Sequence, residues 1–229
     1  MFDSYLRESI LGRAIKEKKI SVTFTNPRKF VTGKYKKVWP DGNVSQQIDE
    51  RPYGGGPGMV MMAEPVIKAV ESVVKKIIHP TLRAPLKRGI IKSKFLIINF
   101  VPSASKFTTE KAKKISGKYT DVILICGRYE GIDTRLDKIL KTTKFSIGDY
   151  VLTGGEIPAM ILIDCISRQV KGVLGNFDSR EEERVSSSVM YTRPEVLVYK
   201  GKKYKVPKIL LSGNHKDIEA WKELTKRVK

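Results

Sequence analysis

Cysteine and histidine are scarce in this sequence, which contains only two of each among 229 residues. Cys126 and Cys165 both lie in apolar segments, so we expect two buried thiols, in keeping with a reducing cytosol. His79 and His215 are far apart, and neither a Cys-x-x-Cys nor a His-Glu-x-x-His spacing occurs. These absences argue against a structural zinc site and against a zinc hydrolase.

The sequence also lacks long apolar runs. No stretch approaches the ~20 apolar residues that span a bilayer, and no signal-peptide pattern opens the chain. We therefore expect a cytoplasmic protein without a membrane partner. The length suits one large domain, or one domain with a small appendage, and is ample for a hydrophobic core.

Acidic residues are outnumbered, with 24 Asp and Glu against 44 Lys and Arg, which gives a formal net charge of +20. Such a charge attracts polyanions, of which nucleic acid is the usual one. The alternative is a lysine-rich composition that has no polyanion partner. The basic residues form clusters, however, and aromatic side chains that could stack on bases lie among them. The clusters are residues 34–37, 83–94, 200–208 and 222–229, and the aromatic residues are Tyr35, Trp39, Tyr199, Tyr204 and Trp221.

Apolar periodicity predicts helices that alternate with strands, which is typical of a largely parallel sheet. The predicted helices are one that begins at Asp3 or Ser4 and continues to Ile15, one from about Pro65 to Ile77, one from Thr108 to Ser116 closed by Gly117, a buried one from Glu156 to about Val170, and a C-terminal one with Ile218, Trp221, Leu224 and Val228 on one face. The predicted strands are residues 20–25, 95–100 and 122–126, and a strand-like stretch around 145–152. Residues 175–190 are polar and aperiodic, as a linker is.

Three glycine-rich loops follow or flank these strands, at residues 53–58, 127–131 and 154–155. None has the G-x-G-x-x-G pattern of dinucleotide-binding folds or the G-x-x-x-x-G-K-[ST] pattern of phosphate loops. Ligands of open parallel sheets bind at the carboxyl ends of the strands, where the second and third loops should lie. The alternative for residues 146–159 is a tight turn in an ordinary α/β domain. Because two loops should converge there, we expect a small-molecule pocket.

Six segments together match one family, in its order and over most of the chain. They are residues 51–59 (RPYGGGPGM), 126–133 (CGRYEGID), 146–159 (SIGDYVLTGGEIPA), 172–176 (GVLGN), 191–195 (YTRPE) and 211–215 (LSGNH). With these segments the chain resembles the bacterial tRNA (guanine-37, N-1)-methyltransferases, the TrmD family of the SPOUT superfamily.

The resemblance implies an α/β fold with a mostly parallel sheet and a C-terminal trefoil knot, plus a small helical C-terminal domain. It implies a SPOUT cofactor-binding domain at residues 1–174, a flexible linker at 175–190 and a shortened tRNA-binding domain at 191–229. It also implies a homodimer that methylates guanosine 37 of tRNA at N-1, with S-adenosyl-L-methionine as cofactor and with Mg²⁺ as a second requirement.

By position, the resemblance assigns a cofactor site and two catalytic residues. The cofactor-binding residues would be Pro102, Gly127, Tyr129, Glu130, Ile147, Gly148, Asp149, Tyr150, Val151, Leu152, Gly154, Gly155 and Pro158. Arg168 matches the arginine near the target guanine, and Glu183 occupies the position of the general base, with Asp178 in reserve. A carboxylate there would remove the N-1 proton, and a guanidinium would stabilise charge on O-6.

The sequence departs from the family at several points. It begins at Met1-Phe2 without the family's first strand, and it has Glu183 in place of Asp. It also carries a basic insertion at residues 83–94, and Val101-Pro102-Ser103-Ala104 replaces Ser-Pro-Gln-Gly. Two alternatives therefore stay open: a catalytically weakened SPOUT-fold RNA-binding protein, and a SPOUT methyltransferase that acts on another RNA site, such as a ribose hydroxyl.

Overall fold

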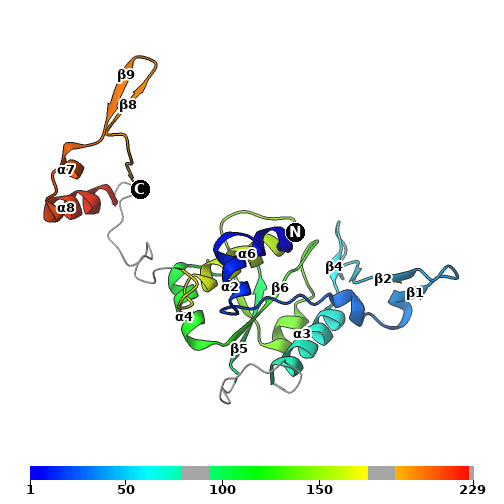
Figure 1. Ribbon diagram of the computed structural model, residues 1–229. Helices are drawn as coiled ribbons and strands as arrows, with labels where there is room; N and C mark the ends of the chain where they lie inside the picture. The colour runs from blue at the N-terminus through cyan, green and yellow to red at the C-terminus, as the bar shows by residue number, and fades with distance from the viewer. Residues whose placement is uncertain (79–92, 175–188, 227–229) are drawn as a thin grey trace. The chain divides into compact units, whose positions relative to one another are not determined.

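The computed structural model describes residues 1–78, 93–174 and 189–226 (Figure 1). The chain divides into two compact units, Met1–Val173 and Leu174–Lys229. The predicted linker carboxylates Asp178 and Glu183, and most of the basic segment 83–94, lie outside the described residues. Among the described residues, no helix is both long enough and apolar enough to cross a membrane.

A three-stranded parallel sheet forms the centre of the first unit. Its strands are β5 (Phe95–Phe100), β6 (Asp121–Ile125) and β7 (Thr143–Phe145), in the order β6-β5-β7. Ile97 pairs with Ile123 on one side of β5, and Phe100 pairs with Phe145 on the other. The parallel sheet and its two longer strands confirm the predicted α/β class. The third strand ends at Phe145, so residues 147–152 are a loop and not a strand as predicted.

Helices cover both faces of this sheet, because side chains alternate along β5. Phe95 and Ile97 pack in a core with α3 (Ala63–Ile78) and α5 (Arg135–Leu140). Leu96 and Ile98 pack in a second core with α4 (Thr109–Lys118) and α6 (Glu156–Ser167). Figure 1 shows α3 apart from α4 and α6, with β5 and β6 between them.

The helix predictions need three corrections. In place of one N-terminal helix there are two, α1 (Phe2–Leu6) and α2 (Ser9–Lys16), and Met1, not Asp3 or Ser4, is the N-cap of the first. The chain folds back so tightly between them that a Cβ on Gly12 would overlap the backbone carbonyl of Arg7. Helix α4 continues through Gly117 to Lys118, and α6 ends at Ser167 and is buried on one side only, at Pro158, Ala159, Leu162 and Ser167.

Residues 20–25 form no strand, which contradicts the alternation seen in the sequence. Their backbone pairs with no described strand, and Phe24 is 57% exposed. Two short antiparallel pairs, which the sequence analysis did not predict, lie between α2 and α3. They are β1 (Lys36–Val38) with β2 (Val44–Gln46), and β3 (Asp49–Glu50) with β4 (Val60–Met61). The 3-10 turns Pro27–Phe30 and Gly33–Tyr35 precede them.

We had expected a helical second unit, but the structure shows that this unit also contains strands. It holds an antiparallel hairpin of β8 (Val196–Tyr199) and β9 (Lys202–Lys205), followed by α7 (Lys208–Leu211) and α8 (His215–Lys226). Ile218 and Trp221 are half-buried, and the Trp221 ring lies 6.4 Å from that of Tyr191. Leu224 is 67% exposed, so it does not belong to a buried face, and Val228 is outside the described residues.

Candidate active site

The segments that follow β6 and precede α6 are joined by their backbones. The amide of Gly155 donates a 2.8 Å hydrogen bond to the carbonyl of Gly127, and Arg128 and Gly154 form an antiparallel bridge. The second and third glycine-rich loops therefore meet at the carboxyl end of the sheet, where parallel sheets bind their ligands.

A third segment, residues 101–107 after β5, is fixed to the same edge. The Val101 amide donates to the Phe145 carbonyl at 3.0 Å, and the Ser146 amide donates to the Ser105 carbonyl at 3.1 Å. The Ser146 side chain accepts a 3.2 Å hydrogen bond from the Gly148 amide, which shapes the start of the loop 147–155. Pro102 lies exposed in this segment.

The first glycine-rich loop also reaches the site, although it lies far away in sequence. The Glu130 amide donates to the Met59 carbonyl at 3.0 Å, and the Met61 amide donates to the Gly131 carbonyl at 2.9 Å. Gly58 has a φ of +91°, and a Cβ there would come within 2.7 Å of the Glu130 side chain. Glycine suits both the backbone conformation and the close approach to Glu130, so packing accounts for Gly58 within the sequence RPYGGGPGM.

Gly155 allows a close approach between two backbone segments. A Cβ at this position would lie 2.7 Å from the Cys126 Cα and 2.9 Å from the Gly127 nitrogen. The residue lets the start of α6 (its N-cap) approach the end of β6, so a bulky substitution there would displace the helix. At Gly148, by contrast, an added Cβ would meet only the ring of Tyr150, which is a movable side chain.

The predicted cofactor residues differ in exposure within this cluster of loops. Gly155 and Pro158 are buried, and Gly127, Ile147, Gly148, Leu152 and Gly154 are half-buried. The exposed members are Pro102, Tyr129, Glu130, Asp149, Tyr150 and Val151. The small and apolar residues of the cluster are thus mostly less exposed than its aromatic and acidic residues.

Ion pairs and burial set the charges around the loops. Arg128 donates to Glu156 through its Nε at 2.8 Å, which ties the loop after β6 to the first turn of α6. Asp149 pairs with Lys106 at the surface. Burial raises the pKa of the half-buried Cys126 thiol to about 12, so this cysteine stays protonated and is a poor nucleophile at neutral pH. The sequence analysis missed the Arg128–Glu156 pair, although an acidic residue in the first turn of a helix was a signal for it.

Of the predicted catalytic residues, the structure describes only Arg168. Arg168 is half-buried and directly follows α6, at the end opposite Gly155. The 12 residues of α6, at a rise of 1.5 Å each, separate its two ends by about 18 Å. Glu183 and Asp178 lie outside the described residues. Among the described residues, no three His, Cys, Asp or Glu side chains are placed to hold a metal ion.

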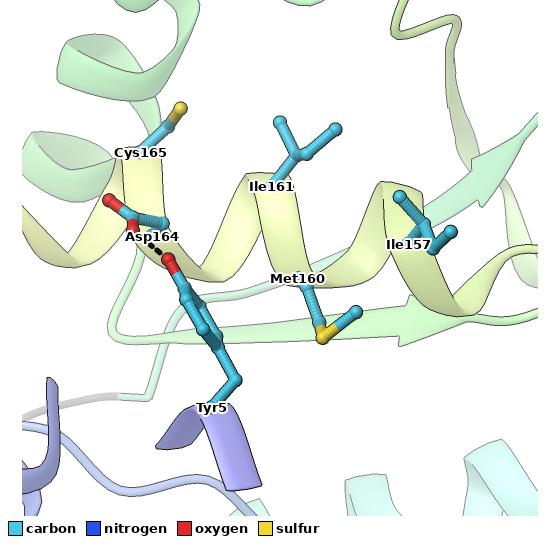
Figure 2. A pocket seen from close by; sticks show the side chains of 6 residues that line it. All are labelled: Tyr5, Ile157, Met160, Ile161, Asp164 and Cys165. Carbon is cyan, nitrogen blue, oxygen red and sulfur yellow. Dashed lines mark hydrogen bonds between the residues drawn. The ribbon is translucent and has the colours of Figure 1, made fainter. Parts of the chain in front are cut away.

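A separate, open groove runs along the side of α6 (Figure 2). It is mostly apolar and is lined by Tyr5, Ile157, Met160, Ile161, Asp164 and Cys165. The Tyr5 hydroxyl donates a hydrogen bond to Asp164 across it, and this bond, with burial, raises the pKa of Tyr5 to about 12. Cys165, like Cys126, is half-buried and not buried as predicted, and Cys165 lines this groove.

Comparison with known proteins identifies the family. All of the chain, residues 1–229, matches the family described as tRNA (Guanine-1)-methyltransferase TrmD. A relative from Blochmanniella pennsylvanica is 39% identical over 227 residues, which cover 97% of this chain and 78% of the relative. One from Photobacterium profundum is 38% identical over 226 residues (97% and 79%), and one from Clostridioides difficile is 40% identical over 228 residues (97% and 86%). Each of the three carries the name tRNA (guanine-N(1)-)-methyltransferase. With its glycine-rich loops assembled at the carboxyl edge of a parallel sheet, the chain belongs to the tRNA (Guanine-1)-methyltransferase TrmD family.

Proposed function

We propose that this chain transfers a methyl group from S-adenosylmethionine to N-1 of guanosine 37 in tRNA. The observation that carries the proposal is that loops 127–131 and 147–155 are joined by a backbone hydrogen bond, and that Gly58 and residues 59–61 meet loop 127–131, in a member of this family. The cofactor would bind at the second and third loops, and the target base would approach the first.

The chemistry of these residues fits the cofactor. An adenine needs backbone hydrogen bonds at its edge and apolar packing on its faces, and the half-buried glycines with Ile147 and Leu152 offer both. The exposed carboxylate of Glu130 suits the positive methionine end. When bound, S-adenosylmethionine supplies an electrophilic methyl group on a sulfonium. Gly127, Tyr129, Tyr150 and Gly154 would orient it, and Pro102 would border the pocket.

Two residues of this chain would act on the guanine. N-1 carries a proton at neutral pH and becomes a nucleophile only when the proton leaves. The Glu183 carboxylate would take that proton, and the Arg168 guanidinium would stabilise the charge that develops on O-6. A Mg²⁺ ion could share this second role, with ligands from the RNA or from residues outside those described.

The position of Arg168 supports a homodimer. Because α6 separates Arg168 from the cofactor loops of its own chain by about 18 Å, both groups meet readily only if they come from different subunits. The half-exposed apolar side of α6, around Ile157 and Met160, is the surface on which a second copy would pack. The trefoil knot and the division into a SPOUT domain at 1–174, a linker at 175–190 and a tRNA-binding domain at 191–229 belong to the same proposal.

The net charge of +20 supports tRNA as the partner and the cytoplasm as the compartment where tRNA is modified. The test is methylation of tRNA transcripts, with nucleoside mass spectrometry of the product. We expect 1-methylguanosine at position 37, and loss of the product when G37 is replaced by A. A ribose-methylated nucleoside, or a methyl group at another position, would overturn the proposal, and tRNA binding without methyl transfer would favour the RNA-binding alternative.

A further inference from the structure

The hairpin β1–β2 (residues 36–46, with its turn) is an arm closed by a hydrogen-bonded turn. Its turn carries Trp39, Pro40, Asp41 and Gly42, and the Gly42 amide donates to the Trp39 carbonyl at 3.0 Å. Pro40 presets the first turn position, and Gly42 takes a φ of +82°, which ends the turn in the left-handed region. The Trp39 amide then donates to the Asn43 carbonyl at 2.8 Å and closes the hairpin.

The arm presents apolar side chains to solvent. Val38 is 67% exposed, Trp39 is 54% exposed and Val44 is 50% exposed. Strand residues 36–38 are all exposed, and so are Val44 and Ser45. A two-stranded hairpin gains little stability in water by itself, and exposed large apolar groups typically mark a binding surface. Figure 1 shows β1 and β2 extending away from the sheet of their unit.

Positive charge surrounds the exposed tryptophan. Lys34, Lys36 and Lys37 precede it and are all exposed, and the Lys34 ammonium lies 4.9 Å from the centre of the Tyr35 ring. By strand alternation, Lys37 and Trp39 belong to one face of the arm. The acidic residue at the tip, Asp41, is engaged by Asn43, whose amides hold the pKa of the Asp41 carboxyl below its usual range.

The base of the arm is anchored beside the glycine-rich loop 53–58. Arg28 donates to the Gln46 carbonyl at 2.6 Å, and the Gln47 amide donates to the Tyr35 carbonyl at 3.0 Å. Ile48 is 3% exposed in the core, and β3 then leads directly into the loop. The arm and the loop that would receive the target base are thus held by the same short stretch of chain.

We propose that residues 36–46 are an RNA-binding arm, on which Trp39 stacks against an unpaired base of the tRNA while Lys37 contacts a phosphate. The inference rests on the proposed function for its substrate. An aromatic side chain among cations is the pattern of single-stranded nucleic-acid sites, because every base has a face on which to stack. The lysines disfavour a purely apolar protein partner.

The first test is kinetic and uses the full-length protein with saturating cofactor. Trp39→Ala should raise the KM for tRNA by about tenfold, the scale of one stacked base, and leave kcat within about twofold. Trp39→Phe should recover most of the loss, because a phenyl ring still stacks. Lys37→Ser should reduce the salt dependence of tRNA binding by about one unit, while Lys114→Ser, at an exposed position on α4, should not. An unchanged KM in Trp39→Ala would overturn the inference.

The second test is spectroscopic and does not need catalysis. The chain has two tryptophans, so Trp221→Phe leaves Trp39 as the single tryptophan, which can be excited selectively over the tyrosines. Addition of an anticodon stem-loop should quench Trp39 emission, and a fully paired duplex should quench it much less. Unquenched emission at RNA saturation would overturn the inference that Trp39 stacks on the RNA, even if G37 is methylated. Quenching in a protein that methylates no tRNA would instead support RNA binding by the arm and contradict the proposed function.

Discussion

Helices α3 and α6 cover opposite faces of the same sheet, yet the residues on their outward sides differ in polarity. Helix α3 buries Val66, Val70 and Ile77 and exposes charged residues, among them Lys75 and Lys76. Helix α6 buries Pro158, Ala159 and Leu162, but its outer side carries Ile157, Met160 and Cys165. Exposure to water is favourable for the charged outward side of α3 and unfavourable for the apolar outward side of α6. Helix α6 therefore calls for a second apolar neighbour, and in the proposed homodimer that neighbour is the other subunit.

The largest effect should come from the proposed general base, Glu183, which lies outside the described residues. Glu183→Gln keeps size and hydrogen bonding but removes basicity, so turnover should fall by ~10²–10⁴-fold with cofactor affinity nearly intact. Glu183→Asp should retain activity, and Asp178→Asn should have little effect. The measurements are single-turnover methylation and calorimetry with S-adenosylmethionine. An inactive Asp178→Asn beside a fully active Glu183→Gln would move the general base to Asp178.

Mixed dimers would sharpen this result. Glu183→Gln and Gly148→Leu subunits should each be inactive, the second because a side chain at 148 displaces Tyr150 from the cofactor loop. Mixing them should restore about a quarter of the parental rate, since half of the dimers would be mixed and each would hold one intact site. No recovery after confirmed subunit exchange would mean that each site is built from one chain. Gly148 is the better choice than Gly155, whose replacement would displace α6 itself.

A matched pair of isoleucines tests the two helix surfaces directly. Ile157 on α6 is 45% exposed and Ile78 on α3 is 53% exposed, so a charge at either is tolerable in a single subunit. Ile157→Glu should weaken the dimer about 100-fold or more, because it buries an unpaired charge between subunits, and Ile78→Glu should not. Sedimentation velocity at micromolar concentration measures both. A parental protein that is monomeric and still methylates tRNA would show that the outward side of α6 is not a required dimer interface.

The smallest effect concerns a buried network on the α3 face. Asp137 accepts hydrogen bonds from Asn99 at 2.8 Å and Thr142 at 2.6 Å and pairs with Lys144 at 2.8 Å. Burial acts to raise the pKa of Asp137, but these partners outweigh it and hold the pKa below its usual range. Asp137→Ala should therefore lower the free energy of unfolding by about 1–3 kcal/mol at neutral pH.

The pH dependence of unfolding separates this network from an ordinary surface pair. Since the folded pKa is depressed, the contribution of Asp137 is present above the unfolded pKa of about 4 and is lost as pH falls through the folded value. Asp3→Ala, which removes an exposed pair with Arg7, should cost less than about 0.5 kcal/mol at any pH. Urea unfolding at pH 7 and pH 3 measures both variants, and equal losses for Asp137→Ala at the two values would contradict the assignment.

The predictable parts of the fold were those with strong periodicity. The apolar run Phe95–Phe100 and the stripe of Val66, Val70 and Ile77 could be assigned because the sheet and its helix bury them continuously. The hairpins β1–β2 and β8–β9 escaped detection because their side chains are mostly exposed and carry little alternation. Residues 20–25 were wrongly predicted as a strand. Their apolar and polar residues alternate, but no neighbouring strand is there to pair with them among the described residues.

The candidate site divides in the same way. The segments 126–133 and 146–159 could be placed at the strand ends from the sequence, because parallel strands put their carboxyl ends together. The contact between Gly58 and Glu130 could not, because it joins residues that no local pattern relates. The roles of Arg168 and Glu183 stay predictions, since they depend on a partner subunit or on residues outside those described.

In the proposed function, the close approach of Gly58 to Glu130 and the backbone hydrogen bonds of Met59 and Met61 beside it would couple the two loops. A ligand that orders residues 127–131 restricts residues 53–58 as well, so less entropy remains to be lost when a second ligand arrives at the other loop. Cofactor and RNA should therefore raise each other's affinity by the same factor, as linkage requires. In this view Gly58 is less a flexible hinge than the coupling between two binding equilibria.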